Sequence, residues 1–231
     1  FISCKPKFIS CKGRNNTKNL MPLYKTITVN DETSLAIWKV EETEEKLWER
    51  IELTPHCQNR FNGMKSELHR KAFLSIRHLL AGYGYVDSDL VYDENGKPHL
   101  RNGNLISITH SHNFTGIIIS TTEHVGIDIE MQRDKILRIA HKFTPFEEYK
   151  TLANTAAIVR KLTIVWGAKE SLYKIYGHRG LSFLHHIDVQ DFRFDTKNTT
   201  AQIIFNGNMS NYKVRFLEFE DFTCVYSTRD N

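Results

Sequence analysis

Two short segments, separated by about 40 residues, constrain this chain more than any other part of its sequence. The first is VGIDIE at residues 125–130, and the second is WGAKESLYK at residues 166–174. Apolar and acidic residues alternate in the first segment, which predicts a strand. Side chains two apart on a strand point the same way, so Asp128 and Glu130 should share one face while the neighbouring isoleucines bury the other. The strand therefore presents paired carboxylates.

The second segment predicts a helix that adds a third carboxylate and a cation. Residues four apart share a helix face, so Trp166, Glu170 and Lys174 should line up. Hard oxygen ligands with room for water and phosphate oxygens suit magnesium, and a lysine suits a phosphate that the metal does not reach. Together the two segments predict a site for a divalent metal and a pyrophosphate, with Asp128, Glu130 and Glu170 as the metal ligands.

Each segment also has a simpler interpretation. Alternating apolar and acidic residues describe any half-exposed strand. A glutamate followed four residues later by a lysine commonly decorates a solvated helix face. The occurrence of both segments, in this order and at this separation, favours the metal and phosphate site.

The two segments together resemble the signature of the 4'-phosphopantetheinyl transferases. Further segments extend the resemblance over roughly residues 65–190, namely GKPHL at 96–100, ISITHSHNF at 106–114, FTPFEEY at 143–149 and GHRGLSF at 177–183. Ser107 departs from the family pattern, which often has asparagine there, but the departure leaves His110 in place. In length the chain resembles the bacterial surfactin-synthetase-activating type more than the short trimeric holo-acyl-carrier-protein synthases.

The resemblance implies an α+β fold of two similar α/β halves in a pseudo-twofold arrangement, with the active site in the cleft between them. It also implies Mg²⁺-dependent transfer of 4'-phosphopantetheine from coenzyme A to a serine of an apo acyl or peptidyl carrier protein, releasing adenosine 3',5'-bisphosphate. Glu170 and Lys174 are the expected catalytic residues. Glu170 is expected either as a metal ligand alone or also as the base that activates the serine, directly or through water.

Coenzyme A carries a pyrophosphate and a 3'-phosphate, so several cations should converge on the site. The resemblance implies that Lys97 and His110 contact these phosphates together with Lys174. Arg70 is a further candidate, because it lies on the basic face of a predicted helix, although such a face is equally typical of a solvated helix. Lys169 is turned about 100° around its helix from Glu170, and we expect it to serve either packing or phosphate binding.

The expected elements divide the chain into two halves, residues 21–124 and 125–231. In the first half we expect strands at 23–29, 33–40, 105–109 and 114–121 and helices at 43–53 and 66–80. In the second we expect a strand from residue 125, helices at 135–142 and 159–175, and strands at 187–194, 200–205, 212–218 and 223–227. Residues 1–20 repeat FISCK and carry five basic residues without an acid. We expect them to be a disordered tail or a non-native extension, with Met21 as the natural start.

Composition fits a globular enzyme with neither nucleic-acid nor membrane partners. The net charge of +4 is concentrated in residues 1–20, so the remainder is nearly neutral. The sequence lacks the run of about 18 apolar residues that a membrane span requires. Cys57 and Cys224 are the only cysteines after residue 20, and no cysteine or histidine cluster has zinc-site spacing, so a reducing cytoplasm is expected. We expect the protein to be a monomer.

Two alternatives to an active transferase remain open. One is a non-catalytic module of the same fold that binds coenzyme A or a carrier protein. The other is a magnesium-dependent phosphohydrolase of unrelated fold, which would use the same carboxylates but would not need the glycine-lysine-proline and histidine segments. The presence of all three carboxylates and the lysine favours the transferase.

Overall fold

The computed structural model describes residues 23–150 and 152–230. The expected tail at residues 1–20 and the start at Met21 lie outside the described residues. Within them, helices and antiparallel strands alternate irregularly along the chain, and the strands form three sheets. This confirms the mixed α+β class.

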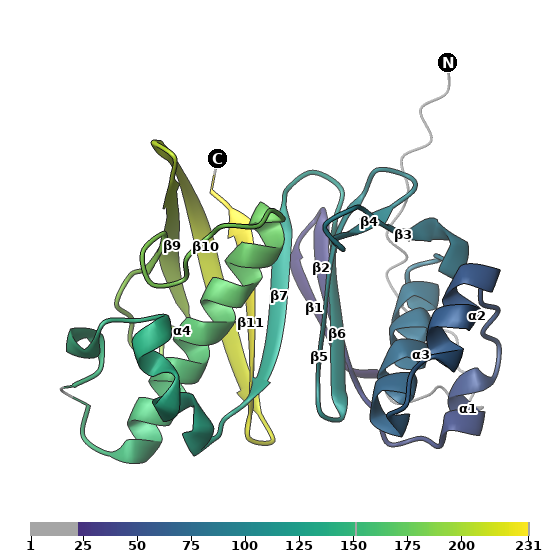
Figure 1. Ribbon diagram of the computed structural model, residues 1–231, viewed down its shortest axis with the longest axis horizontal. Coiled ribbons are helices and arrows are strands. Elements are labelled where there is room, and N and C mark those ends of the chain that lie inside the picture. Colours follow the sequence, from purple (N-terminus) through teal and green to yellow (C-terminus); the bar gives the residue numbers. More distant parts are fainter. Residues whose placement is uncertain (1–22, 151, 231) are drawn as a thin grey trace.

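The first sheet has four strands in the order β1-β2-β6-β5 and is called here the N-terminal sheet. Its strands are β1 (Leu23–Asn30), β2 (Thr33–Lys39), β5 (Leu105–Ser111) and β6 (Phe114–Ser120). One face is covered by α3 (Glu67–Gly82), with α1 (Glu44–Trp48) and α2 (Pro55–Asn62) beside it, as Figure 1 shows. A small hairpin of β3 (Leu90–Tyr92) and β4 (Pro98–Leu100) leads into β5.

The second sheet, called here the C-terminal sheet, has the strand order β7-β11-β10-β9-β8. Its strands are β7 (Val125–Met131), β8 (Ile187–Val189), β9 (Asn198–Phe205), β10 (Asn208–Phe219) and β11 (Phe222–Arg229). The long helix α4 (Thr155–Tyr176) lies across one face of this sheet. Asn154 caps its first turn by accepting from the amide of Ala157, and Gly177 ends it in the left-handed region at φ 73°, where glycine is favoured.

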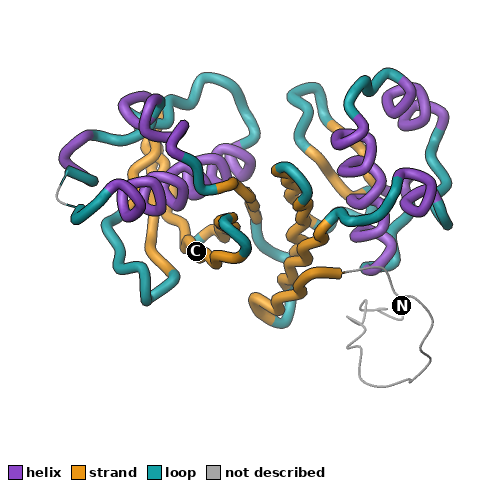
Figure 2. Tube along the Cα trace, turned by 90° about the horizontal axis from the view of Figure 1, so that it is seen from below, coloured by secondary structure: helices purple, strands orange, loops and turns teal. Residues whose placement is uncertain are grey.

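The two sheets pack against each other through a third core. Isoleucines, phenylalanines and other apolar residues from β2, β6, β7 and β11 fill the space between them, and β5 lies next to β7 at the seam between the sheets. The resulting order of layers is helix, sheet, sheet, helix (Figure 1). Figure 2 shows the helices of the two halves well apart, with strands between them.

Two of the expected helices are wrong in extent. The helix expected at 43–53 ends at Trp48, because the chain turns at Arg50 with a positive φ of 65° and restarts as α2 behind the Thr54 cap. The helix expected at 135–142 is instead two 3₁₀ turns, η2 (Asp134–Arg138) and η3 (Ala140–Lys142). Ile136 and Ile139, three residues apart, both pack on the core, a spacing that suits three residues per turn.

The close approach of α4 to β7 depends on a glycine. A Cβ added to Gly126 would lie 1.9 Å from the carbonyl oxygen of Ser171 on α4. No side chain larger than hydrogen fits there, so the helix backbone rests directly on the strand. None of the helices in the described part of the chain has the length and hydrophobicity needed to cross a lipid bilayer.

Candidate active site

Alternate residues of β7 point to opposite sides of the C-terminal sheet. Val125, Ile127 and Ile129 enter the core between the two sheets. Asp128 points to the other side, where its Oδ1 lies 2.8 Å from Nζ of Lys174 on α4. The strand period therefore places the acidic residues of β7 against α4.

Lys174 holds both the side chain and the backbone of β7. Its Nζ donates to Asp128 Oδ1 at 2.8 Å and to the carbonyl oxygen of Ile127 at 2.7 Å. The Asp128 side chain is 8% exposed and that of Lys174 28%. A charged pair this far from water keeps a larger share of its Coulomb attraction than a surface pair does. The cation at the end of the WGAKESLYK segment thus fixes the carboxylate in the middle of the VGIDIE segment.

Glu130 and Glu170 complete an acidic cluster around this pair. Burial, together with the charges of Asp128 and Glu170, raises the pKa of Glu130 to about 7. Burial and the charge of Asp128 raise the pKa of Glu170 to about 7, and Lys174 opposes this shift. Both carboxyl groups are close enough to Asp128 to feel its charge. The two acidic residues of β7 and Glu170, about 40 residues later on α4, thus form one cluster.

The chemistry of this cluster fits a divalent cation. Among the described residues, no group of three or more His, Cys, Asp or Glu side chains is already placed to hold a metal ion. However, Asp128 Oδ2 is buried without a hydrogen-bond partner, which is costly for a charged oxygen. A cation beside it would supply that partner and offset the repulsion that raises the pKa of both glutamates. Asp128, Glu130 and Glu170 therefore remain the predicted ligands.

Comparison with known families bears on this half of the chain. Residues 124–227 match the family model of the 4'-phosphopantetheinyl transferase superfamily. The match runs through β7, α4 and the remaining strands of the C-terminal sheet, and it supports a phosphopantetheinyl transferase role in general terms. No curated protein matches the chain significantly.

The matched region leaves out the N-terminal half, where His110 stands next to the acidic cluster. His110 lies on β5 with its side chain exposed. Surrounding protein atoms and the positive charges of His69 and Lys174 lower its pKa, while Asp128 opposes this. His110 is thus within electrostatic range of the Asp128–Lys174 pair, as expected of a residue at the same site.

His69 is a member of the site that the sequence did not suggest. Its ring lies on α3, and its centroid is 5.8 Å from that of His110 in an edge-to-face arrangement. A lone histidine at the start of a helix carries no motif, and only the packing of α3 on the N-terminal sheet brings it to His110. The two imidazoles, one from α3 and one from β5, therefore lie together in the N-terminal half.

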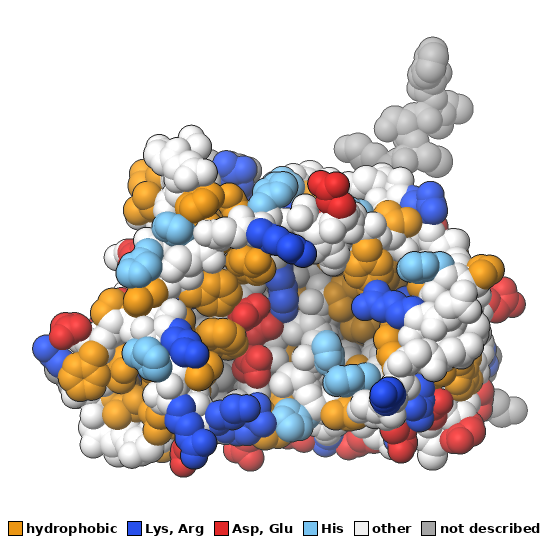
Figure 3. Space-filling view, viewed as in Figure 1, with side chains coloured by type: hydrophobic (Ala, Val, Ile, Leu, Met, Phe, Trp, Pro, Cys, Tyr) orange, Lys and Arg blue, Asp and Glu red, His pale blue; other side chains and the backbone are white. Residues whose placement is uncertain are grey.

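Figure 3 shows a hollow in the middle of this face of the molecule, with charged and histidine side chains around it. Acidic side chains lie on one wall, a basic side chain lies directly above them, and histidines lie on the opposite wall. Acidic and histidine side chains thus face each other across an open space, with a basic side chain above the acidic ones. Such a space suits a ligand that carries phosphates and a metal ion together.

Lys97 reaches α4 but not the acidic cluster. Its Nζ donates to the carbonyl oxygen of Ile175 in the last turn of α4 at 2.7 Å, and burial lowers its pKa. The side chain also lies over Gly177, where an added Cβ would be 2.7 Å from Lys97 Cδ. In this structure Lys97 caps the carboxyl end of the helix, a position that the helix dipole favours for a cation.

Arg70 and Lys169, the other two cations considered from sequence, have partners inside the protein. Arg70 Nε lies 2.7 Å from Glu44 Oε2, and its Nη1 donates to the carbonyl oxygen of Met64. Lys169 is 2% exposed and donates to the carbonyl oxygens of Phe183 and Ile187. The structure thus gives Lys169 a packing role and ties Arg70 to the helices of the N-terminal half.

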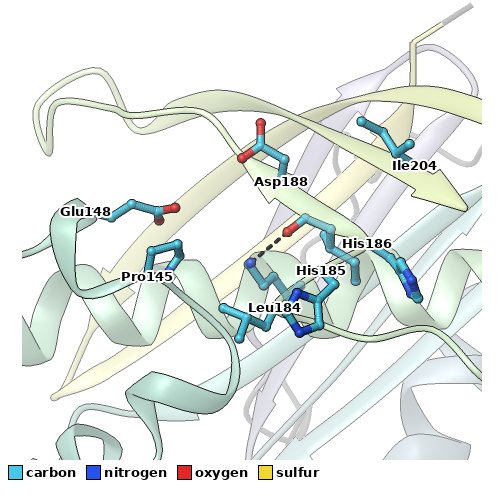
Figure 4. A pocket seen from close by; sticks show the side chains of 9 residues that line it. Pro145, Glu148, Leu184, His185, His186, Asp188 and Ile204 are labelled. Atoms are coloured by element: carbon cyan, nitrogen blue, oxygen red, sulfur yellow. Dashed lines mark hydrogen bonds between the residues drawn. The ribbon is translucent and has the colours of Figure 1, made fainter.

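Two cavities in the described residues lie near the site but are not lined by its carboxylates. The larger, about 310 Å³, is lined by Ile139, Lys142, Trp166 and Phe183, and Trp166 lies one helical turn before Glu170. The smaller, about 180 Å³, lies over Lys169 between η4 (Phe146–Glu148) and the segment leading into β8. Figure 4 shows that acidic side chains and the histidine pair His185 and His186 face this smaller space.

Proposed function

We propose that the protein transfers 4'-phosphopantetheine from coenzyme A to a serine of an apo acyl or peptidyl carrier protein, with Mg²⁺. The observation that carries this proposal is the acidic cluster of Asp128, Glu130 and Glu170 joined to Lys174. The carboxylates and Lys174 lie in the region that matches the superfamily, and Asp128 and Lys174 are close enough to His110 to influence its pKa.

In the proposed reaction the serine oxygen attacks the phosphorus that bears the pantetheine arm. A new bond from the serine oxygen to phosphorus forms, and the bond to the leaving adenosine 3',5'-bisphosphate breaks. Glu170 is proposed to accept the serine proton, directly or through water, because it is the carboxylate on α4 that lies in the cluster beside Lys174. When bound, Mg²⁺ supplies positive charge to the phosphate oxygens.

The cations of the site are proposed to receive the phosphates of coenzyme A. Lys174 stands beside the carboxylates, so its ammonium can neutralise charge on the pyrophosphate while still holding Asp128. His110 and its neighbour His69 face it from the other half. Lys97 would have to release the carbonyl of Ile175 in order to join them. Arg70, tied to Glu44, is the weakest candidate of the predicted set.

The carrier protein is proposed to dock over η2 and η3. Carrier proteins of this family usually present an acidic helix around the modified serine, and a basic surface would attract such a helix. The exposed residues here include Arg133, Lys135, Leu137, Arg138 and Lys142. The apolar cavity of about 310 Å³ opens beside them and is lined partly by Lys142 and Trp166. Cationic and apolar groups thus lie together next to the acidic cluster.

Finer assignments follow from the resemblance described above. We propose the surfactin-synthetase-activating type, a monomer acting in the cytoplasm, with its two sheet-and-helix halves related by a pseudo-twofold axis. The helix-sheet-sheet-helix order of layers is what such an axis would produce. Both described cysteines, Cys57 and Cys224, are buried free thiols, as is usual in a reducing compartment.

The test is intact-protein mass spectrometry of an apo carrier protein after incubation with this protein, coenzyme A and Mg²⁺. The expected result is a gain of one phosphopantetheine that is abolished by chelating the metal and by Asp128→Ala. Several apo carriers should be tried, since the partner is not specified by the site. Absence of any gain, in a sample that still binds coenzyme A, would contradict the proposal and favour a non-catalytic binding module.

A further inference from the structure

The seam between the two sheets is closed by side chains and not by a backbone ladder. Strands β5 and β7 are edge strands of different sheets. On β5, Ser107 Oγ accepts from the amide of Ile127 at 3.2 Å, and Thr109 Oγ1 accepts from the amide of Ile129 at 3.0 Å. Ser107 and Thr109 are both buried, at 3% and 4% exposure. These two hydroxyls thus replace the backbone partners that β7 lacks on its outer edge.

Thr109 differs from Ser107 in what it does with its proton. A hydroxyl has one proton to donate, and Thr109 Oγ1 already accepts from Ile129. Its own proton is directed to Asp128 Oδ1, at a long distance of 3.4 Å. Within the described residues, Ser107 makes no contact of this kind with a carboxylate. The Thr109 methyl group lies close to Gly116 on the neighbouring strand β6, where an added Cβ would be 3.3 Å from it.

Asp128 Oδ1 is therefore held from both halves of the protein. Lys174 donates to it from α4 and Thr109 donates to it from β5. The second oxygen, Oδ2, is buried and has no hydrogen-bond partner. The two donors on Oδ1 thus orient the carboxylate so that Oδ2 is the oxygen left for a ligand. This arrangement requires the two halves to be docked, since one donor comes from each.

We infer that Thr109 is a positioning residue that orients Asp128 for divalent-metal binding across the seam between the two halves. The inference rests on the proposed role of Asp128 as a metal ligand. Hydrogen bonds to a ligating carboxylate commonly change metal affinity by about 10- to 100-fold when they are removed. Ser107 and Thr109 each make one hydrogen bond to the backbone of β7. Removing the Ser107 hydroxyl therefore measures the effect of losing such a bond without any change at Asp128.

The experiment compares Thr109→Val, Thr109→Ser and Ser107→Ala in the full chain. Valine keeps the shape of threonine without its hydroxyl, and serine keeps the hydroxyl without the methyl group. Mn²⁺ affinity is measured by isothermal titration and by electron paramagnetic resonance of free Mn²⁺, without coenzyme A or carrier protein. Thermal unfolding of each variant reports the loss of the seam bond.

The expected result separates the two hydroxyls. Thr109→Val and Ser107→Ala should lower the unfolding temperature to a similar extent, because each loses one buried seam bond. Mn²⁺ affinity should fall about tenfold in Thr109→Val and stay near wild type in Thr109→Ser and Ser107→Ala. An unchanged affinity in Thr109→Val, an equal loss in Ser107→Ala, or no Mn²⁺ binding by the wild-type protein would each overturn the inference.

The transferase assay then distinguishes this inference from the proposed function. If the wild-type protein transfers phosphopantetheine, Thr109→Val should raise the half-saturating Mg²⁺ concentration about tenfold while the rate at saturating Mg²⁺ stays near wild type. If Mn²⁺ affinity falls as expected but no carrier is modified, the inference stands and the proposed function fails.

Discussion

Lys174 Nζ lies 2.8 Å from Asp128 Oδ1, and the same ammonium group donates to the backbone of β7 one residue earlier. The pair joins the last turns of α4 to the middle of β7. Lys174 therefore both holds helix and strand together and places a positive charge on the carboxylate whose Oδ2 has no hydrogen-bond partner. Stability and activity should both depend on it, and they can be measured separately.

Replacing Lys174 with Met should lower the free energy of unfolding by about 2 kcal/mol, because it leaves the mostly buried Asp128 without its counter-charge. Transfer should fall on the order of 10²-fold, as for other losses of a charge at a phosphoryl centre. Urea unfolding and the mass-spectrometric assay provide the two readouts. The exposed pair Lys213 and Asp230 is the control, since Lys213→Met should cost less than about 1 kcal/mol and leave transfer intact. Equal losses of stability in the two variants would contradict the prediction.

The raised pKa of Glu170 predicts how stability of the metal-free protein depends on pH. Its pKa rises from 4.5 in the unfolded chain to about 7 in the folded protein, so the folded state binds the proton more tightly. Ionised Glu170 therefore destabilises the folded protein. This effect is absent below about pH 4.5, grows as the pH rises and is complete above about pH 7. Each pKa unit corresponds to about 1.4 kcal/mol, which gives an effect on the order of 1–3 kcal/mol at pH 8.

Glu170→Gln should consequently raise the free energy of unfolding at pH 8 and leave it nearly unchanged at pH 4. Adding Mg²⁺ at pH 8 should reduce the difference in free energy of unfolding between the variant and the wild-type protein, because the metal should stabilise the wild-type protein more. The exposed Glu94 offers a matched control, Glu94→Gln, which should change stability little at either pH. A stabilisation by Glu170→Gln that is the same at both pH values would show that its charge is not the cause.

The parts of the site that follow a period could be predicted from sequence. Strand alternation places Asp128 opposite α4, and helical spacing places Glu170 and Lys174 on the side that meets it, because both periods are fixed by backbone geometry. The hairpin of β5 and β6 was equally predictable, since two apolar runs flank a short polar turn. These relations are local, so no knowledge of tertiary packing was needed.

The contacts that cross between elements could not be predicted in the same way. Nothing in the sequence distinguishes His69 from an ordinary helix residue, and its approach to His110 depends on how α3 packs on the N-terminal sheet. Ser107 and Thr109 look like ordinary strand residues, although they close the seam to β7. The contact of the Lys97 ammonium with the last turn of α4 is likewise not indicated by the sequence. Such contacts depend on the docking of whole layers.

The contact between Lys97 and Gly177 predicts a difference between two glycines of similar backbone conformation. Gly177 has φ 73° with the Lys97 side chain 2.7 Å from an added Cβ, whereas Gly207 has φ 77° with nothing within 4 Å. Gly207→Ala should therefore cost about 1 kcal/mol from backbone strain alone. Gly177→Ala should cost about 1 kcal/mol more, because the flexible Lys97 side chain would move aside and its ammonium would leave the carbonyl oxygen of Ile175. Chemical denaturation measures both.

A third variant identifies the cause of that difference. In a Lys97→Ala background the extra cost of Gly177→Ala should disappear, because the clashing side chain is gone, while the cost of Gly207→Ala should stay the same. If the excess persists without the lysine side chain, the difference between the two glycines arises from some other feature of the end of α4.

Gly126 is a position at which the addition of one methyl group should strongly destabilise the protein. Its Cβ would meet the Ser171 carbonyl at 1.9 Å, and that oxygen belongs to the α4 backbone, which cannot rotate away. Gly126→Ala should therefore push α4 off β7, cost about 3 kcal/mol or more and separate Lys174 from Asp128. The thermal unfolding temperature and the rate of phosphopantetheine transfer should both fall. Gly82, near the end of α3, has nothing within 4 Å, so Gly82→Ala should be neutral or stabilise by about 0.5 kcal/mol. A Gly126→Ala protein with wild-type stability would contradict the direct contact between strand and helix backbone on which the geometry of the site depends.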